Sequence, residues 1–191
     1  TVKTRLKLTD ELGYVMPKII FKDDEDLNPY EFCIKVRGFE VCRGVVYPEH
    51  TMFFAENIHF DKKPKNAIYD VDVVTGEKIV WLNGKETKDF WEQGLSGSEY
   101  IARVLEHAAV KYVDELIDYS DVEKYIDVVD GVNSFLVDNI IPDIISLADL
   151  RYILTSLIRE KVSIKNIVYI FEKMNDFAVD APKNERIKRI R

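Results

Sequence analysis

The sequence predicts an α+β protein, with strands in its first half and helices in its second. Segments that alternate apolar and polar residues lie before residue 85, whereas helical spacing of apolar residues, preceded by capping sequences, dominates after residue 97. Strands followed by helices, without alternation of the two, are typical of the α+β class. The chain has 191 residues, 47% of them hydrophobic and 12% aromatic, which is enough to fill globular cores.

A weak helical pattern opens the chain and is followed by an extended run. Three leucines give weak helical spacing over residues 4–12: Leu6, Leu8 and Leu12. Gly13 is a typical helix stop, because glycine tolerates the left-handed conformation that ends many helices. The run YVMPKIIF, residues 14–21, is expected to be extended.

A β-hairpin is predicted over EFCIKVRGFEVCRGVVY, with Arg37-Gly38 as its two-residue turn. In this register Lys35 faces Glu40 on one side of the ribbon. The apolar residues share the other side: Phe32, Ile34, Val36, Phe39 and Val41. The register satisfies both faces, and a shift by one residue would exchange them.

The same register sets Cys33 directly opposite Cys42, at a separation that permits a strained cross-strand disulfide. We favour the alternative of two thiols on a partly covered sheet face, because a free cysteine behaves as a small hydrophobic residue. Two cysteines in 191 residues do not make a disulfide framework, and they favour a reducing compartment.

Residues 51–96 contain two further strand patterns. They are TMFFAENI, residues 51–58, and KIVWLN, residues 78–83. Lys62 to Lys65 and the Thr75-Gly76 pair are expected to form loops between strands.

Two helices are predicted from capping boxes, in which an acidic residue follows a serine after three positions. Ser96 with Glu99 opens the first helix. Its apolar stripe is Ile101, Leu105, Ala108, Tyr112 and Leu116. Ser120 with Glu123 opens the second helix, in which Gly131 is a weak point and which ends before Pro142. Its apolar residues are Ile126, Val129, Phe135 and Leu136.

Two shorter amphipathic helices follow, over SLADLRYILTSLIREKVSIKNIVYIFEKM. Ser146 with Asp149 caps the first of them, and Ser163 caps the second. The first buries Leu150, Ile153, Leu154, Leu157 and Ile158. The second buries Ile164, Ile167, Ile170, Phe171 and Met174.

The charge balance is acidic, with 27 basic and 34 acidic residues, a net charge of -7 and a pI near 5.1. This net negative charge disfavours extensive binding to duplex nucleic acid, which needs a basic face. There is no run of 18 apolar residues and no charged-then-apolar leader. The first residue is Thr1 rather than Met, so we expect the chain to be a piece of a longer protein.

The sequence offers no support for catalysis, a metal or a cofactor. A calcium loop starting at Asp24 would need glycine and a bidentate acid where Pro29 and Lys35 stand, so the acidic run Asp23–Asp26 is expected to be a solvated loop. The three histidines lack the close spacing of metal or hydrolytic sites, and there is no phosphate loop, G-x-S-x-G or dinucleotide motif. We expect no enzyme, although a pocket can assemble from scattered residues.

The last two helices, residues 147–176, together with a basic tail at residues 181–191 suggest an alternative function as a nucleic-acid-binding module. A groove-reading second helix would carry basic and amide donors. Here its polar residues form a near-neutral face: Lys165, Asn166, Glu172, Lys173 and Asn175. The basic residues gather in the tail instead, where we favour a charge-rich connector to a further unit.

Two longer segments resemble a known family. ELGYVMPKIIFKDDEDLNPYEFCIKVRGFEVCRGVVYPEH is similar to the start of the cytosolic domain of the type III export-gate (FHIPEP) family, which includes FlhA of flagella and InvA of virulence secretion systems. IIPDIISLADLRYILTSLIREKVSIKNIVYIFEKM is similar to a later V-P-D-x-x-S-L block of the same family. With GEKIVWL and the helix from Ser98, the similarity runs from about residue 5 to residue 178.

The resemblance implies linked subdomains. Residues 1–50 and 97–116 would form a split ferredoxin-like subdomain, residues 51–96 a small inserted subdomain, residues 117–180 a helical subdomain, and residues 181–191 a basic connector to a missing C-terminal subdomain. It also implies a multi-pass membrane parent, with this part on the cytoplasmic side of the bacterial inner membrane. There the family assembles as a ring that receives secretion substrates, their chaperones and other export-apparatus proteins, and does no covalent chemistry; alone, the fragment is expected to be monomeric.

The resemblance also implies a docking site. Flagellar members bind chaperones through an Asp, a Phe three residues later and a Thr early in the following long helix. The matching positions here are Asp72, Thr75 and Arg103, so one of the three residue types is kept. Loss of an aromatic anchor argues against flagellin-chaperone binding and favours a virulence-type or divergent gate. Asp72 is equally consistent with an ordinary loop acid.

Overall fold

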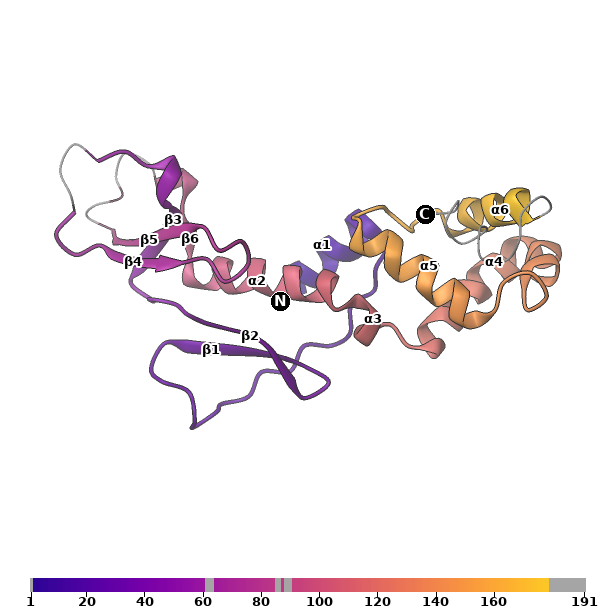
Figure 1. Cartoon of the computed structure of the whole chain (residues 1–191), viewed down its shortest axis with the longest axis horizontal. Coiled ribbons are helices and arrows are strands. Elements are labelled where there is room, and N and C mark those ends of the chain that lie inside the picture. Colours follow the sequence, from indigo (N-terminus) through magenta and orange to yellow (C-terminus); the bar gives the residue numbers. More distant parts are fainter. Residues whose placement is uncertain (1, 61–63, 85–86, 88–90, 179–191) are drawn as a thin grey trace. The chain divides into compact units, whose positions relative to one another are not determined.

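The computed structural model describes residues 2–60, 64–84, 87 and 91–178. The chain divides into two compact units, the first made of Ile19–Ala108 and the second of Val2–Lys18 with Ala109–Arg191. The strands lie in the first unit and most helices lie in the second (Figure 1), which confirms the α+β class. The finer subdomain limits implied by the resemblance stay a prediction.

A four-stranded antiparallel sheet forms the centre of the first unit, in the order β4-β5-β3-β6. Its strands are β3 (His50–Phe54), β4 (Ile68–Val71), β5 (Lys78–Asn83) and β6 (Leu95–Ser96). The predicted strand over 78–83 is confirmed, and that over 51–58 is confirmed in its first half, after which the 3-10 helix η1 (Ala55–Asn57) follows. A second 3-10 turn, η2 (Trp91–Gln93), precedes β6.

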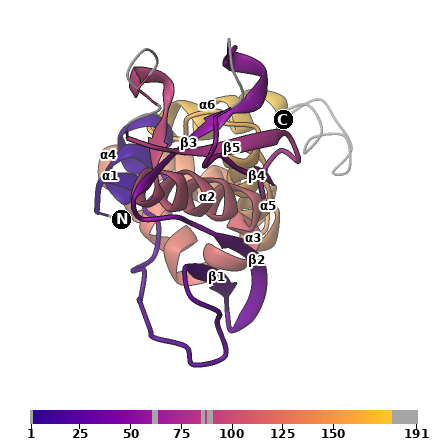
Figure 2. The same ribbon diagram turned by 90° about the vertical axis from the view of Figure 1, so that its left-hand side faces the viewer.

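Strand alternation gives this sheet two apolar faces. Met52 and Trp81, which pair across β3 and β5, lie in one core cluster with Tyr100 and Val104 of helix α2 (Gly97–Lys111). The opposite face holds a second cluster: Phe53, Ile58, Val80 and Leu82. Figure 2 shows α2 between the sheet and a separate two-stranded ribbon.

The ribbon is the predicted hairpin, β1 (Glu31–Val36) and β2 (Phe39–Val45), but its register differs beyond the turn. Lys35 pairs with Glu40 as predicted, and an irregularity then leaves Val41 without a partner, so that Ile34 pairs with Cys42. The predicted facing of Cys33 and Cys42 is therefore wrong: Cys33 pairs with Arg43. The structure records both cysteines as thiols.

Packing explains the shifted register. Phe32 pairs with Gly44, and a Cβ atom at Gly44 would lie 2.8 Å from the Phe32 ring, so the ring occupies the space that glycine leaves. The shift turns Cys42 toward the core cluster in place of Val41. Phe39, predicted to share the apolar face, is 77% exposed.

The second unit contains α1 (Val2–Leu12), α3 (Val113–Leu116), α4 (Tyr119–Ile140), α5 (Leu147–Arg159) and α6 (Ile167–Ala178). Helices α5 and α6 both pack against α4 (Figure 1). The predicted stop at Gly13 is confirmed, with φ +71°. The turn there is tied to the rest of the unit, because the Tyr125 hydroxyl donates to the Gly13 carbonyl at 3.0 Å and the Ile164 amide donates to the Leu12 carbonyl at 2.8 Å.

The predicted apolar stripe of α5 is buried in full. In the segment that includes α6, four of the five predicted residues are buried and Ile170 is partly exposed. The apolar stripe predicted for α2 is wrong by one position at its start, because Tyr100 and Val104 are buried in the core and Ile101 is partly exposed. Leu6 and Phe135, also predicted to be apolar contacts, are 58% and 71% exposed.

Two predicted caps are confirmed and two are wrong. The Ser96–Glu99 and Ser146–Asp149 boxes form as expected. Helix α4 begins two residues earlier than the Ser120 cap predicts, because Asp118 and Asp121 make the reciprocal capping bonds. Helix α6 is capped by Asn166, whose side chain accepts from the Tyr169 amide at 3.2 Å, so the cap at Ser163 is wrong.

Candidate functional site

The Asp72 carboxylate lies at the tight turn that joins β4 to β5. The Asp72 amide donates to the Glu77 carbonyl and the Gly76 amide donates to the Asp72 carbonyl, each at 2.8 Å. Gly76 has φ +77°, a conformation that glycine adopts without steric cost. The turn brings the Thr75 amide to 3.0 Å and the Thr75 hydroxyl to 2.8 Å from Asp72 Oδ2.

Helix α2 supplies the other partners of this carboxylate. The Tyr100 hydroxyl donates to Oδ1 at 3.0 Å, and Arg103 Nη1 donates to Oδ1 at 2.9 Å and to Oδ2 at 3.1 Å. Residues three apart on a helix lie on one face, so both side chains point at the same turn. The Tyr100 hydroxyl also accepts from the Val73 amide at 3.1 Å. We call Asp72, Thr75, Tyr100 and Arg103 the Asp72 cluster.

Burial and charge decide which members of the cluster reach solvent. The Asp72 side chain has no exposed surface, whereas the Arg103 side chain is 29% exposed and Thr75 is exposed. Burial raises the pKa of the Asp72 carboxyl, but the hydrogen bonds from Arg103, Thr75 and Tyr100 outweigh it and the net pKa is lowered. Asp72 is therefore a buried anion that holds Arg103 in place.

Aromatic rings pack against Tyr100 and Arg103 and hold both side chains in place. The Tyr100 ring meets Trp81 edge-on at 5.6 Å and Phe32 at 6.3 Å between centroids. The Arg103 guanidinium lies over the Phe54 ring, 5.2 Å from its centroid, in a cation-π contact. Burial, followed by the neighbouring Asp72 charge, raises the pKa of Tyr100, so its hydroxyl stays protonated and remains a donor.

The Thr75 hydroxyl has two acidic neighbours. It lies 2.8 Å from Asp72 Oδ2 and 2.7 Å from Glu77 Oε2. A hydroxyl has one proton, so it donates to one of these carboxylates at a time. The exposed rim of the site is thus polar: an arginine edge, a hydroxyl and a carboxylate.

All three predicted site residues come together, although Arg103 is 31 positions from Asp72 in the sequence. Sequence reasoning missed Tyr100 and Phe54. A signal for Tyr100 was present, since it precedes Arg103 by three positions on the predicted helix. No sequence signal ties Phe54 to Arg103, because the two meet only through sheet packing.

The alternative nucleic-acid surface gains no support. Lys165 Nζ donates to the Asp10 carbonyl at 2.8 Å, and Lys173 Nζ pairs with Asp176 at 2.8 Å, so Lys165, which precedes α6, and Lys173 on α6 are both engaged within the chain. The basic tail over 181–191 lies outside the described residues.

Within residues 2–60, 64–84, 87 and 91–178, no group of three or more His, Cys, Asp or Glu side chains is placed to hold a metal ion. No helix in the same ranges is long and apolar enough to cross a bilayer.

The sequence model of the FHIPEP family matches residues 1–189. The chain belongs to the FHIPEP family. Among curated relatives, the flagellar biosynthesis protein FlhA of Bacillus subtilis is 28% identical over 179 residues, which are 92% of this chain and 26% of that protein. FlhA of Escherichia coli is 25% identical over 177 residues, 91% of this chain and 25% of that protein. The chain thus spans about a quarter of the length of these FHIPEP relatives.

Solved structures share the FHIPEP fold. The Chlamydia pneumoniae CdsV protein, in a complex with CdsO, matches with a TM-score of 0.81 and 19% identity, over 99% of this chain and 59% of that chain. The Shigella flexneri MxiA protein matches with a TM-score of 0.77 and 12% identity, over 99% and 59%. The nonameric SctV-C of EPEC matches with a TM-score of 0.71 and 16% identity, over 99% and 58%.

Proposed function

We propose that this chain is the cytosolic part of the export gate of a type III protein secretion apparatus and works as a docking platform for substrates and their chaperones. Its relatives are named flagellar biosynthesis proteins, and the EscV cytosolic domain, which shares its fold, comes from a type III secretion system. In this proposal the parent is embedded in the bacterial inner membrane, the chain lies on the cytoplasmic side, and it needs no cofactor and performs no covalent chemistry.

The docking contact we propose is the exposed rim of the Asp72 cluster. Arg103 and Thr75 would meet the partner, because they are the exposed members, and Asp72 would act as the positioning residue beneath them. The observation that carries this is the convergence of two distant segments on one buried carboxylate, with an arginine fixed at the surface. A side chain that is already held in one conformation before binding loses less conformational entropy on binding than a mobile one.

The polar rim favours a virulence-type or divergent gate over a flagellin-chaperone gate. The flagellar pattern uses an aromatic residue at the position of Thr75, and buried aromatic anchors dominate many interfaces. Here the Thr75 hydroxyl bonds to carboxylates instead. We expect the partner to present hydrogen-bonding groups at this point rather than an apolar pocket.

We also propose that the full-length parent forms a ring, for which the nonameric SctV-C and EscV structures are the support. The subdomain division at residues 1–50 with 97–116, 51–96 and 117–180 is part of the same proposal. The test is to concentrate or tether the full-length cytosolic domain, mix it with chaperones encoded beside it, and examine the sample by electron microscopy and sedimentation. Ring-sized particles and chaperone complexes are expected; absence of both at every concentration would overturn the proposal.

A further inference from the structure

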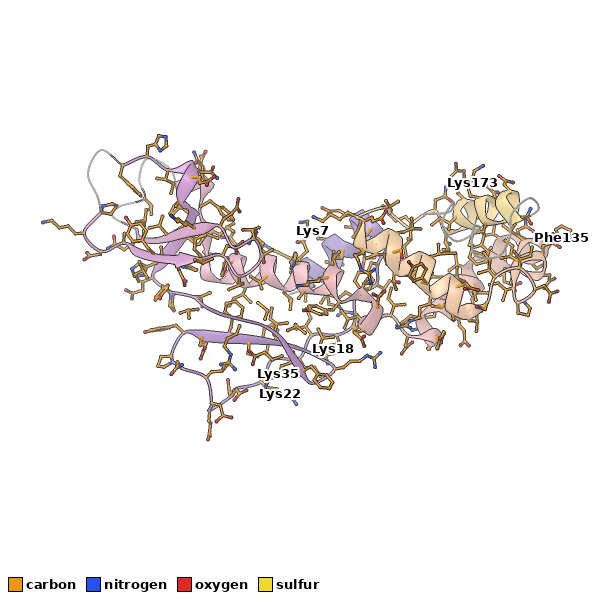
Figure 3. The ribbon with its side chains drawn as sticks, in the orientation of Figure 1. Lys7, Lys18, Lys22, Lys35, Phe135 and Lys173 are labelled. Carbon is orange, nitrogen blue, oxygen red and sulfur yellow. The ribbon has the colours of Figure 1, made fainter. Side chains whose placement is uncertain are left out.

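Helix α4 carries a second apolar stripe that faces solvent. Val128, Val132 and Phe135 are 54%, 70% and 71% exposed, and they recur at four and three positions. Figure 3 shows the Phe135 side chain pointing away from the ribbon of the helical unit. Isolated exposed apolar residues are normal, but three gathered in one short stretch of α4, on both sides of the break at Asn133, form an apolar surface of the kind that marks interaction sites. We call these three residues the α4 ridge.

The α4 ridge is separate from the apolar residues that hold α4 in the fold. The helix buries Val122, Val129, Leu136 and Ile140, which recur about every seven positions on another face. Packing against α5 and α6 uses that inner face. Nothing in the described residues requires the ridge to be apolar for folding.

A break in α4 widens the exposed surface. Asn133 has non-helical φ -155° and ψ 86°, and its side chain caps the following turn by accepting from the Leu136 amide at 3.3 Å. Residues 131–135 are all exposed. Gly131 adds no side chain, and a Cβ atom there would meet nothing within 4 Å, which leaves room beside the ridge for a partner side chain.

The charge of α4 selects the partner. The helix has five carboxylates and one lysine, and that lysine, Lys124, is paired with Asp121 at 2.8 Å. The other four carboxylates are exposed: Glu123, Asp127, Asp130 and Asp138. A symmetric contact in which α4 of one copy faces α4 of another would set like charges against each other, which disfavours that contact. A cationic partner gains from the same charges.

We propose that the α4 ridge binds a basic amphipathic helix that presents large aliphatic side chains beside lysine or arginine. An exposed apolar surface on a helix is matched by the apolar face of another helix packed against it. The exposed carboxylates of α4 would speed the encounter with a cationic partner. This surface is independent of the Asp72 cluster and of the docking proposed there.

The probe for this proposal is a synthetic peptide helix of about 18 residues, long enough to be helical in water, with leucine on one face and lysine on the other. A second peptide carries glutamate in place of every lysine. Binding to the full chain is measured by fluorescence anisotropy at low and high salt. We expect the leucine/lysine peptide to bind, binding to weaken as salt rises, and the leucine/glutamate peptide not to bind.

Matched variants locate the contact. Phe135→Ser is expected to weaken binding about tenfold, as for a central apolar anchor, and Asp127→Asn with Asp130→Asn is expected to reduce the salt dependence. Leu6→Ser is the control, since Leu6 is an apolar residue of the same unit, 58% exposed, on α1. All these positions are exposed, so the variants are expected to fold, which circular dichroism checks. Equal binding of both peptides, no binding of either, or equal effects of F135S and L6S would overturn the proposal.

Discussion

Replacement of Asp72 by asparagine tests the physical basis of the Asp72 cluster. The carboxylate accepts hydrogen bonds on both oxygens, from Arg103, Tyr100 and Thr75. Asparagine keeps the shape but offers one acceptor oxygen and one NH₂ donor. Whichever way the amide turns, its NH₂ group faces donors, and Arg103 loses its anionic partner.

The magnitude follows from the charge and burial of the bonds. A hydrogen bond to a charged group contributes roughly 1.5 to 3 kcal/mol, and a buried donor left without an acceptor adds to the loss. Arg103 is 29% exposed, so water can take over part of its solvation. We therefore expect Asp72→Asn to lower the free energy of unfolding by about 2 to 3 kcal/mol, below the range for a fully buried ion pair.

The loss depends on pH in a defined direction. The pKa of Asp72 is lowered from its ordinary value of 3.8 in the folded protein, mainly because Arg103 and Thr75 outweigh burial. A carboxyl whose folded pKa is depressed stabilises the fold above its unfolded pKa, and that stabilisation is lost as the pH falls through the folded pKa. The difference between wild type and Asp72→Asn should be constant above about pH 5 and shrink below about pH 4.

Urea unfolding followed by tryptophan fluorescence measures this difference, because both tryptophans, Trp81 and Trp91, belong to the first unit. The matched control is Asp70→Asn, two residues earlier, where the side chain is exposed and the expected change is within about 0.5 kcal/mol. If Asp72→Asn cost no more than the control, or cost the same at pH 3 as at pH 7, the reasoning would be refuted.

Three further outcomes test the fold. Gly13→Ala should destabilise the fold by about 2 kcal/mol or more, because φ is +71° and the new Cβ would lie 2.8 Å from the Lys165 amide nitrogen. Gly131→Ala, where a Cβ atom meets open space, should stabilise the fold by about 0.5 to 1 kcal/mol. Urea unfolding compares the two variants. Asp118→Ala should cost about 1 kcal/mol and Ser120→Ala less than half of that, and equal costs would contradict the assigned cap. Thiol titration of the unfolded protein without reductant should count both cysteines, and a count of zero would contradict the reduced pair.

Local signals in the sequence predicted the helices better than the sheet. The Ser146–Asp149 box and the apolar stripe of α5 are set by residues within one or two turns, so both could be predicted. Asp118 and Ser120 both begin plausible capping boxes, and only the structure distinguishes them. The exposure of Phe135 was missed because the break at Asn133 interrupts the helical periodicity that placed it inward.

The hairpin register and the site depend on contacts between distant residues. The alternation of apolar and polar residues in β1 and β2 is compatible with a regular pairing. In the structure the Phe32 ring fills the space beside Gly44, and the register shifts so that Phe32 pairs with Gly44. The resemblance to a family supplied the positions Asp72, Thr75 and Arg103. That Asp72 is buried and binds the other two follows from the approach of α2 to the β4–β5 turn, which no local pattern encodes.

Crosslinking at the rim of the Asp72 cluster tests the docking claim most directly. The full-length cytosolic domain would carry benzoylphenylalanine in place of Glu77, an exposed residue next to Thr75, and a second protein would carry it in place of Tyr169, which is 51% exposed on α6. Each is irradiated with a purified chaperone from the same secretion locus. We predict an adduct at position 77 that unlabelled domain competes away and that position 169 does not give; no adduct at 77, or equal adducts at both positions, would contradict docking at this site.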